Sequence, residues 1–260
     1  MKSQVLILVV LAVCAGPLVA SADWDGPDEW TKYYQMPDPD GWDIQMTAPK
    51  TLADDFPCWD TDPITDIHFW GSWRHDDVGD IVQINWSIHL NVPADVDPQQ
   101  PWSHPGPQVW GGTVFPGQFS IRQVGEGDQG WYDPNTGEYF PTDHKGIWQV
   151  NMFLDRKDWF WQEGSPDGTQ PTIYWLDLQV LVEAPDTTAF GWKTSNIQWE
   201  DDAVWQDDDW ADFWEPLEDP LGSGVSLDMA FVITTIPEPG VFVLAGLGLL
   251  GLLGLRRRGR

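Results

Sequence analysis

Residues 81–90 read Ile-Val-Gln-Ile-Asn-Trp-Ser-Ile-His-Leu, and this stretch decides the fold class. Every second position is apolar: Val82, Ile84, Trp86, Ile88 and Leu90. The positions between them are polar: Gln83, Asn85, Ser87 and His89. Because successive side chains of a β-strand point to opposite faces, this period of two predicts a strand with one buried and one solvated face. Half-buried strands of this kind are typical of antiparallel sheets.

The same alternation recurs outward along the chain. It is strong in 148–154, 176–182 and 227–233, and weaker in 64–73, 118–124 and 189–194. Clusters of Asp, Pro, Asn and Gly at 76–80, 133–137 and 164–168 predict the turns between strands. We therefore expect about seven or eight strands in an all-β fold, a jelly-roll-like β-sandwich spanning 23–236.

The first 22 residues have the parts of a secretory signal peptide. Lys2 precedes an apolar run over 5–13, and small residues follow at Ala20 and Ala22. The run is too short to span a bilayer comfortably, so we expect export through the Sec translocon and cleavage by signal peptidase after Ala22. Cys14 leaves lipid attachment open as an alternative, although Val13 stands where the lipoprotein peptidase requires a small residue.

The C-terminal residues 237–260 combine three features in a fixed order. Pro237, Glu238 and Pro239 come first, an apolar and Gly-rich run covers 241–255, and the cluster 256–260 contains Arg256, Arg257 and Arg258. We predict one membrane helix over 241–255, with the Arg cluster retained in the cytoplasm by the positive-inside rule. An ordinary C-terminal anchor is the alternative.

This order of features resembles the PEP-CTERM sorting signal of bacterial surface proteins. The resemblance implies that the chain is a substrate of an exosortase, which delivers it to the cell surface or extracellular matrix. The middle region is similar to a domain of unknown function that recurs in secreted bacterial proteins. The stretches that carry the similarity are 50–56, 64–73, 130–139, 173–177, 191–195 and 201–205. That second resemblance implies a β-sandwich ectodomain and no particular activity.

Composition limits the partners of the chain. It has 41 Asp and Glu against 13 Lys and Arg, a formal net charge of −28 at neutral pH. Nucleic acid is excluded as a partner, because phosphate binding requires Lys and Arg to displace counterions. The 19 Trp argue against disorder. Cys58 is the one cysteine left after signal cleavage, so no intrachain disulfide is expected.

Two Asp-rich turns are candidate calcium sites, since calcium prefers oxygen ligands on flexible loops. One contains Asp133, Asn135 and Glu138, and the other contains Asp76, Asp77 and Asp80. Neither has the EF-hand spacing. For 133–138 the alternative is a hairpin turn whose Pro and Gly set the backbone.

Candidate glycan contacts lie in the Trp- and acid-rich stretch 199–214, at Trp205, Trp210 and Trp214. Flat aromatic rings stack on the apolar faces of sugars, and carboxylates accept hydrogen bonds from sugar hydroxyls. Asp177 is the single acid most worth testing for catalysis, but no catalytic pair can be chosen without distances.

The sequence thus predicts a non-enzymatic surface or matrix protein that binds polysaccharide, with Ca²⁺ as a candidate cofactor. A carbohydrate-active enzyme on a jelly-roll scaffold is one alternative. The other is a salt-adapted shell protein with no specific ligand, whose acidic surface serves solubility.

Overall fold

The computed structural model describes residues 23–28, 30–207, 213–222 and 224–235. The predicted signal peptide, its cleavage residues, the sorting motif, the membrane helix and the Arg cluster lie outside these ranges, as does Trp210. Among the described residues, no helix combines the length and the apolar composition needed to cross a lipid bilayer.

The larger of the two main sheets has eight strands. Their order is β1 (Thr31–Gln35), β16 (Phe231–Thr234), β5 (Asp66–Trp73), β9 (Glu138–Phe153), β8 (Phe119–Asp133), β2 (Trp42–Gln45), β12 (Phe190–Ser195) and β15 (Asp228–Met229). Only β2 and β8 run parallel among these pairs. Because β5 also pairs with β12, the pairings of β5, β9, β8, β2 and β12 close into a ring.

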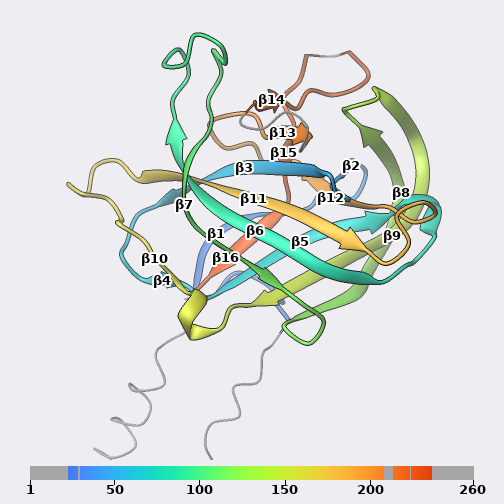
Figure 1. The fold of residues 1–260 in the computed structure, drawn as a ribbon, viewed down its shortest axis with the longest axis horizontal. Coiled ribbons are helices and arrows are strands. Elements are labelled where there is room, and N and C mark those ends of the chain that lie inside the picture. Colours follow the sequence, from blue (N-terminus) through green and yellow to red (C-terminus); the bar gives the residue numbers. More distant parts are fainter. Residues whose placement is uncertain (1–22, 29, 208–212, 223, 236–260) are drawn as a thin grey trace, which may run out of the picture. The chain divides into compact units, whose positions relative to one another are not determined.

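The second main sheet has six antiparallel strands. Their order is β14 (Glu215–Pro216), β13 (Val204–Asp207), β3 (Lys50–Cys58), β11 (Thr172–Val182), β6 (Ile81–Val92) and β7 (His104–Val114). The smaller elements are the pair β10 (Phe160–Trp161) and β4 (Pro63–Ile64), and the 3₁₀ helices η1 (Arg74–Asp76) and η2 (Arg156–Asp158). In Figure 1, β6 and β11 pass across β5 and β16 of the larger sheet.

Aromatic side chains from both sheets pack against one another and form the core. Phe56 of β3 lies 6.0 Å from Tyr174 of β11 and 6.3 Å from Phe231 of β16, measured between ring centroids. Phe231 in turn lies 5.9 Å from Trp192 of β12. The two contacts of Phe231 are edge to face, and such contacts add to the stabilisation that burial supplies. The two sheets therefore form a sandwich-like, all-β arrangement, and the predicted fold class is confirmed.

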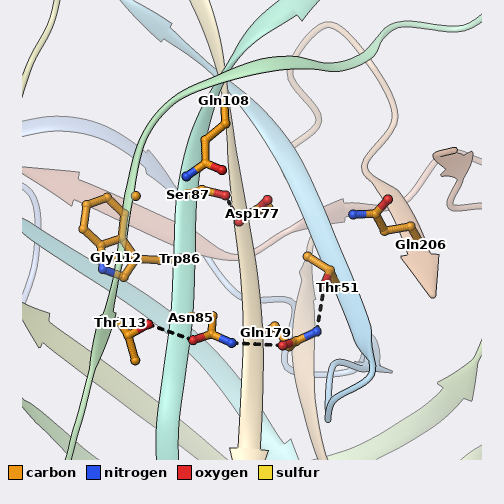
Figure 2. A pocket seen from close by; sticks show the side chains of 11 residues that line it. Thr51, Asn85, Trp86, Ser87, Gln108, Gly112, Thr113, Asp177, Gln179 and Gln206 are labelled. Carbon is orange, nitrogen blue, oxygen red and sulfur yellow. Dashed lines mark hydrogen bonds between the residues drawn. The ribbon is translucent and has the colours of Figure 1, made fainter. Parts of the chain in front are cut away.

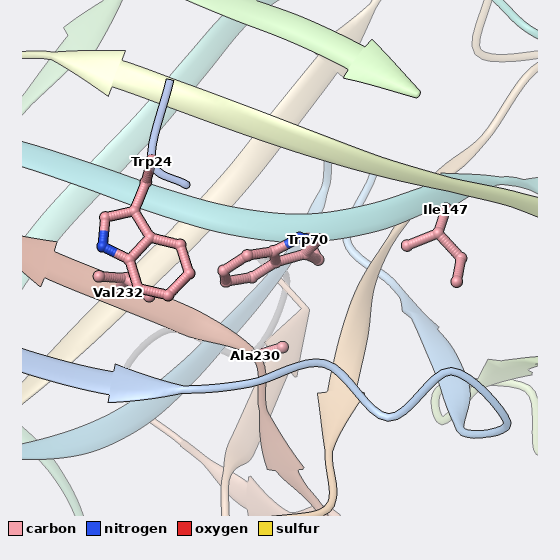
Figure 3. Packing of buried hydrophobic residues seen from close by; sticks show 5 residues of the cluster. All are labelled: Trp24, Trp70, Ile147, Ala230 and Val232. Carbon is pink, nitrogen blue, oxygen red and sulfur yellow. The ribbon is translucent and has the colours of Figure 1, made fainter. Parts of the chain in front are cut away.

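A second apolar cluster lies on the opposite face of the larger sheet (Figure 3). It consists of Trp24, Trp70, Ile147, Ala230 and Val232. The indole rings of Trp24 and Trp70 meet edge to face, 5.7 Å apart at 83°. Trp24 thereby attaches the segment before β1 to the sheet, and its backbone N–H donates to Oδ1 of Asn151.

The structure corrects the expected number and limits of the strands. Sixteen strands form among the described residues rather than seven or eight. Four have only two residues, too few to show an alternation. The predicted strand 227–233 is divided into β15 and β16 at Ala230. Val82 and Leu90, expected to be buried, are each 38% exposed, because they lie toward the two ends of β6, where its pairings shift register.

Candidate functional site

A pocket of about 400 Å³ lies on the six-stranded sheet, on the face away from the aromatic core (Figure 2). Alternation explains its polarity. In β11, Leu176, Leu178 and Val180 point into the core, so Asp177 and Gln179, which alternate with them, point outward. The residues that line it are Thr51 of β3, Asn85, Trp86 and Ser87 of β6, Gln108, Gly111, Gly112 and Thr113 of β7, Asp177 and Gln179 of β11, and Gln206 of β13.

Small residues in β7 keep this pocket open. Gly111 stands opposite Ser87 in the strand register. A Cβ atom at Gly111 would lie 2.8 Å from Cβ of Ser87 and 2.6 Å from Nε2 of Gln108. These separations are shorter than van der Waals contact, so a larger residue would push the neighbouring side chains out of position.

A row of hydrogen bonds crosses four strands on one side of the pocket (Figure 2). Thr113 Oγ1 donates to Asn85 Oδ1 at 3.0 Å, and Asn85 Nδ2 donates to Gln179 Oε1 at 3.0 Å. Gln179 Nε2 then donates to Thr51 Oγ1 at 3.1 Å. The row fixes the orientation of both amides, so their positions are set before any ligand arrives.

Gln206 offers a hydrogen-bond acceptor that the protein does not use. Its Oε1 is buried and has no partner among the described residues. A buried amide oxygen without a partner is costly, since it has lost its hydrogen bonds to water.

Ser87, His89 and Asp177 form a compact polar group beside the amides. Ser87 Oγ donates to Asp177 Oδ1 at 2.6 Å, and His89 Nε2 lies 2.9 Å from Asp177 Oδ2. His89 Nδ1 contacts the carbonyl oxygen of Gly106 at 2.8 Å. Burial alone would lower the pKa of His89, but the hydrogen bond and charge of Asp177 outweigh it and raise that pKa. Nδ1 therefore faces a carbonyl acceptor, and Nε2 faces the carboxylate of Asp177.

This geometry differs from that of a nucleophilic triad. In a triad, the histidine accepts the serine proton at one ring nitrogen and is oriented by the carboxylate at the other. Here Ser87 and Asp177 both approach Nε2 of His89, the serine lying 3.0 Å away, and the hydroxyl donates to the carboxylate. The hydroxyl of Ser87 is therefore directed to Asp177 rather than to the imidazole.

Two of the three predicted glycan-contact residues, Trp205 and Trp214, have packing positions, and Trp210 lies outside the described residues. Trp205 lies on the core side of β13, opposite Leu52, and is 4% exposed. Trp214 is also 4% exposed and packs with Ala53, Trp175 and Val204. Neither ring presents a face to solvent. The amide and hydroxyl row was missed in the sequence, although the alternation of β6 and β11 could have indicated it.

The predicted calcium ligands are drawn into contacts within the protein. Asp133 Oδ1 lies 3.5 Å from Lys50 Nζ, Asn135 Nδ2 donates to Asp207, and Glu138 pairs with Arg74. These residues form a turn between β8 and β9, with Gly137 at a positive φ of 71°.

In the second predicted calcium turn, Asp76 accepts backbone N–H groups of Lys145 and Gly146, and Asp77 and Asp80 are exposed. In the part of the chain that is described, no three His, Cys, Asp or Glu side chains are placed to hold a metal ion.

The most perturbed carboxylic acids were not singled out in the sequence. Asp54, Asp55 and Asp228 are at most 1% exposed. Asp54 accepts the backbone N–H groups of Asp55 and Met229, whereas neither carboxylate oxygen of Asp55 has a hydrogen-bond partner among the described residues. Burial, together with the charges of Asp201 and Asp228, raises the pKa of Asp55 to about 9. Asp55 is therefore a neutral acid at pH 7.

Comparison with known families gives two matches. Residues 31–234 match a family described as a domain of unknown function (DUF7901). Residues 235–258 match the PEP-CTERM protein-sorting motif. No curated protein matches the chain significantly.

Proposed function

Because the chain belongs to the DUF7901 family, with a PEP-CTERM sorting motif directly after that domain, we propose that it is a polysaccharide-binding surface module. The sorting motif makes it an exosortase-sorted protein, a membrane-anchored precursor that is exported and reaches the cell surface. Both resemblances inferred from the sequence are thereby confirmed. The ligand and the mode of binding belong to the proposal.

The observation that carries the proposal is the row of fixed amides and hydroxyls in the pocket. Asn85 and Gln179 are oriented by neighbours, and Gln206 beside them has a buried amide oxygen with no partner among the described residues. Sugars present many hydroxyl groups that both donate and accept, which suits such a surface. The pocket volume of about 400 Å³ falls in the range of small-ligand sites, room for a short stretch of a polysaccharide chain.

The charge of the chain favours a neutral polysaccharide over an acidic one. At a formal net charge of −28, the protein repels uronic acids and sulfated sugars at low ionic strength. Among the described residues that line the pocket, the one carboxylate is that of Asp177, and it is paired with His89. Binding through uncharged hydrogen bonds should therefore depend little on salt.

The enzyme alternative has weaker support. Glycosidases require two carboxyl groups about 5 to 9.5 Å apart around the scissile bond. Among the described residues that line the pocket, Asp177 is the only acid. This favours binding without cleavage. A shell protein without a ligand is the remaining alternative, and it predicts no saturable binding.

Calcium is retained as a secondary proposal. The acids at 76, 77, 80 and 138 lie at the surface, whereas Asp133 is buried. A cation would have to compete there with Lys50, Arg74 and backbone N–H groups for those oxygens. Unfolding measured with and without Ca²⁺ tests this directly.

Affinity electrophoresis and calorimetry test the binding proposal. The purified chain is titrated with neutral polysaccharides, uronic-acid polysaccharides and the extracellular polysaccharide of the producing cells. We expect saturable binding to a neutral polymer and release of no reducing sugar. Gln179→Ala and Asn85→Ala should each weaken binding about threefold to tenfold, the value of one hydrogen bond.

Gln123→Ala is the matched control, since Gln123 is an exposed amide on β8 of the other sheet. Equal loss of affinity in this control, or binding that the pocket variants leave unchanged, would place the ligand elsewhere. Reducing sugar released by the wild type and not by Asp177→Asn would favour the enzyme alternative.

A further inference from the structure

A buried pair of opposite charges lies in the larger sheet, away from the pocket. Lys193 of β12 and Asp43 of β2 are direct cross-strand partners. Nζ of Lys193 lies 3.1 Å from Oδ2 of Asp43, and both side chains have no exposed area. Trp131 of β8, also in register with Asp43, is fully buried beside them. An amine and a carboxyl group are thus held in contact where water does not reach.

A third group contacts the same carboxylate oxygen. His144 Nε2 lies 2.9 Å from Oδ2 of Asp43, and His144 Nδ1 lies 3.0 Å from Asp143. Asp143 contacts Nδ1 of His75 at 2.8 Å, and the side chain of His75 is 55% exposed. These contacts form a path for protons between the buried carboxylate and solvent.

The imidazole ring of His144 is in its protonated, positively charged form at neutral pH. Burial alone would lower the pKa of His144, but hydrogen bonds to Asp143 and Asp43 outweigh it and raise that pKa to about 9. A protonated imidazole in contact with a carboxylate oxygen can act as a general acid toward that oxygen.

We propose that Lys193 and Asp43 become joined by an intramolecular isopeptide bond once the chain has folded. Nζ of Lys193 first passes one proton to Oδ2 of Asp43, which it contacts, and the resulting neutral amine then attacks Cγ of Asp43, so a C–N bond forms and the Cγ–Oδ2 bond breaks. Of the three ammonium protons, one stays on the amide nitrogen and two leave with Oδ2 as one molecule of water. His144 gives a proton to Oδ2 and takes one back from Nζ, so it ends unchanged.

The environment favours this reaction over a lasting ion pair. Two charges removed from water are costly even when paired, and the amide replaces both with a neutral group. Oδ1 of Asp43 is buried and has no hydrogen-bond partner among the described residues. This oxygen becomes an amide carbonyl, which is less costly to leave unpaired than a carboxylate oxygen. Neighbouring strands hold the reacting groups in contact, which removes the entropic cost of their encounter.

Such a bond would stabilise this exported protein in the way that a disulfide stabilises other exported proteins. Cys58 is a free cysteine, and no second cysteine remains after the predicted signal cleavage. A link between residues 43 and 193 closes a long loop, which restricts the unfolded chain most strongly.

Mass spectrometry of the full chain tests the proposal. The purified protein is denatured and digested with trypsin, which cuts after Lys32, Lys50, Lys157 and Lys193 in an unlinked chain. We expect a branched peptide that contains residues 33–50 and the segment around Lys193, lighter than its two parts by one water. Recovery of the free peptides 33–50 and 158–193 as the main products would overturn the proposal.

The chain holds its own control in a second buried pair, Lys50 and Asp133, 3.5 Å apart. His144 does not contact that pair, so trypsin should still cut after Lys50. Lys193→Arg keeps the positive charge but should abolish the branched peptide, because a guanidinium is a poor nucleophile.

His144→Gln, with folding checked by tryptophan fluorescence, should lower the linked fraction at least tenfold. An unchanged linked fraction in His144→Gln would refute the role of His144 as the acid.

Discussion

Asp55→Asn should make the protein more stable at neutral pH, although it alters a fully buried residue. Asp55 lies on β3, and its two carboxylate oxygens have no hydrogen-bond partner among the described residues. Burial and the charges of Asp201 and Asp228 raise its pKa from 3.8 to about 9. An asparagine has nearly the same shape and never ionises. The substitution therefore removes a group that must take up a proton when the chain folds.

The size of the effect follows from linkage between protonation and folding. At pH 7 the unfolded chain has lost the Asp55 proton and the folded chain retains it. The gap between pH 7 and the unfolded pKa of 3.8 is about three units, at about 1.4 kcal/mol each. Asp55→Asn should thus raise the free energy of unfolding at pH 7 by up to about 4 kcal/mol. For a domain of this size, that corresponds to about 10 °C in Tm.

The sign of the pH dependence provides a second test. Because the folded-state pKa of Asp55 is raised, its contribution to stability is fully present below pH 4 and is lost as the pH rises toward 9. The assay is urea unfolding followed by tryptophan fluorescence from pH 4 to pH 9. EDTA is included so that no cation replaces the proton. Wild type should lose stability across this range, and Asp55→Asn should lose less.

Asp77→Asn is the matched control, because Asp77 is an exposed acid and its replacement should change stability little. If Asp55→Asn is no more stable than wild type at pH 7 and the two show the same pH dependence, the reasoning is refuted.

Three further substitutions or additions test other parts of the structure. Gly191→Ala places a Cβ 2.9 Å from the Trp131 ring and 3.0 Å from Cβ of Asp43, so it should lower the free energy of unfolding in urea by about 1–3 kcal/mol. Gly125→Ala is the control that should be tolerated, because the nearest neighbour of its Cβ lies 3.7 Å away. Phe231→Ala empties the centre of the aromatic core and should cost about 3–5 kcal/mol; a loss below 1 kcal/mol would show that the sheets do not pack through this ring. If the turns at 76–80 and 133–138 bind calcium, Ca²⁺ should raise the Tm above that in NaCl of equal ionic strength, and Asp133→Asn or Asp76→Asn should reduce the rise; an equal response to NaCl would mean that the acidic surface is only screened.

The periodicity and the order of residues in the sequence determined the fold class and the sorting motif of this protein. Alternation of apolar and polar side chains is a local property, and it predicted β6, β11 and the β-rich character of the chain. The order of Pro237, Glu238, Pro239, an apolar run and Arg residues identified the sorting motif, since a receptor or enzyme reads such a signal as a linear sequence.

The tertiary structure alone decided where the site lies. Alternation predicts that Asn85 and Gln179 both point outward from their strands. It does not predict that β6 and β11 pair, or that these two residues stand opposite each other. Thr51 and Gln206 reach the same pocket from strands that are distant in sequence. Strand pairing depends on contacts between distant segments, which a local pattern does not specify.

The same limit explains the tryptophans and the buried charges. Trp205 and Trp214 stand among acidic residues in the sequence, as surface residues would, yet packing against β3 and β11 buries both. Asp43, His144 and Lys193 come from three separate strands and meet because β2 pairs with β12 on one side and with β8, the partner of β9, on the other. The local sequence determined whether a side chain points into the core or away from it. Pairing between distant strands determined which side chains become neighbours, because only the folded chain brings those strands together.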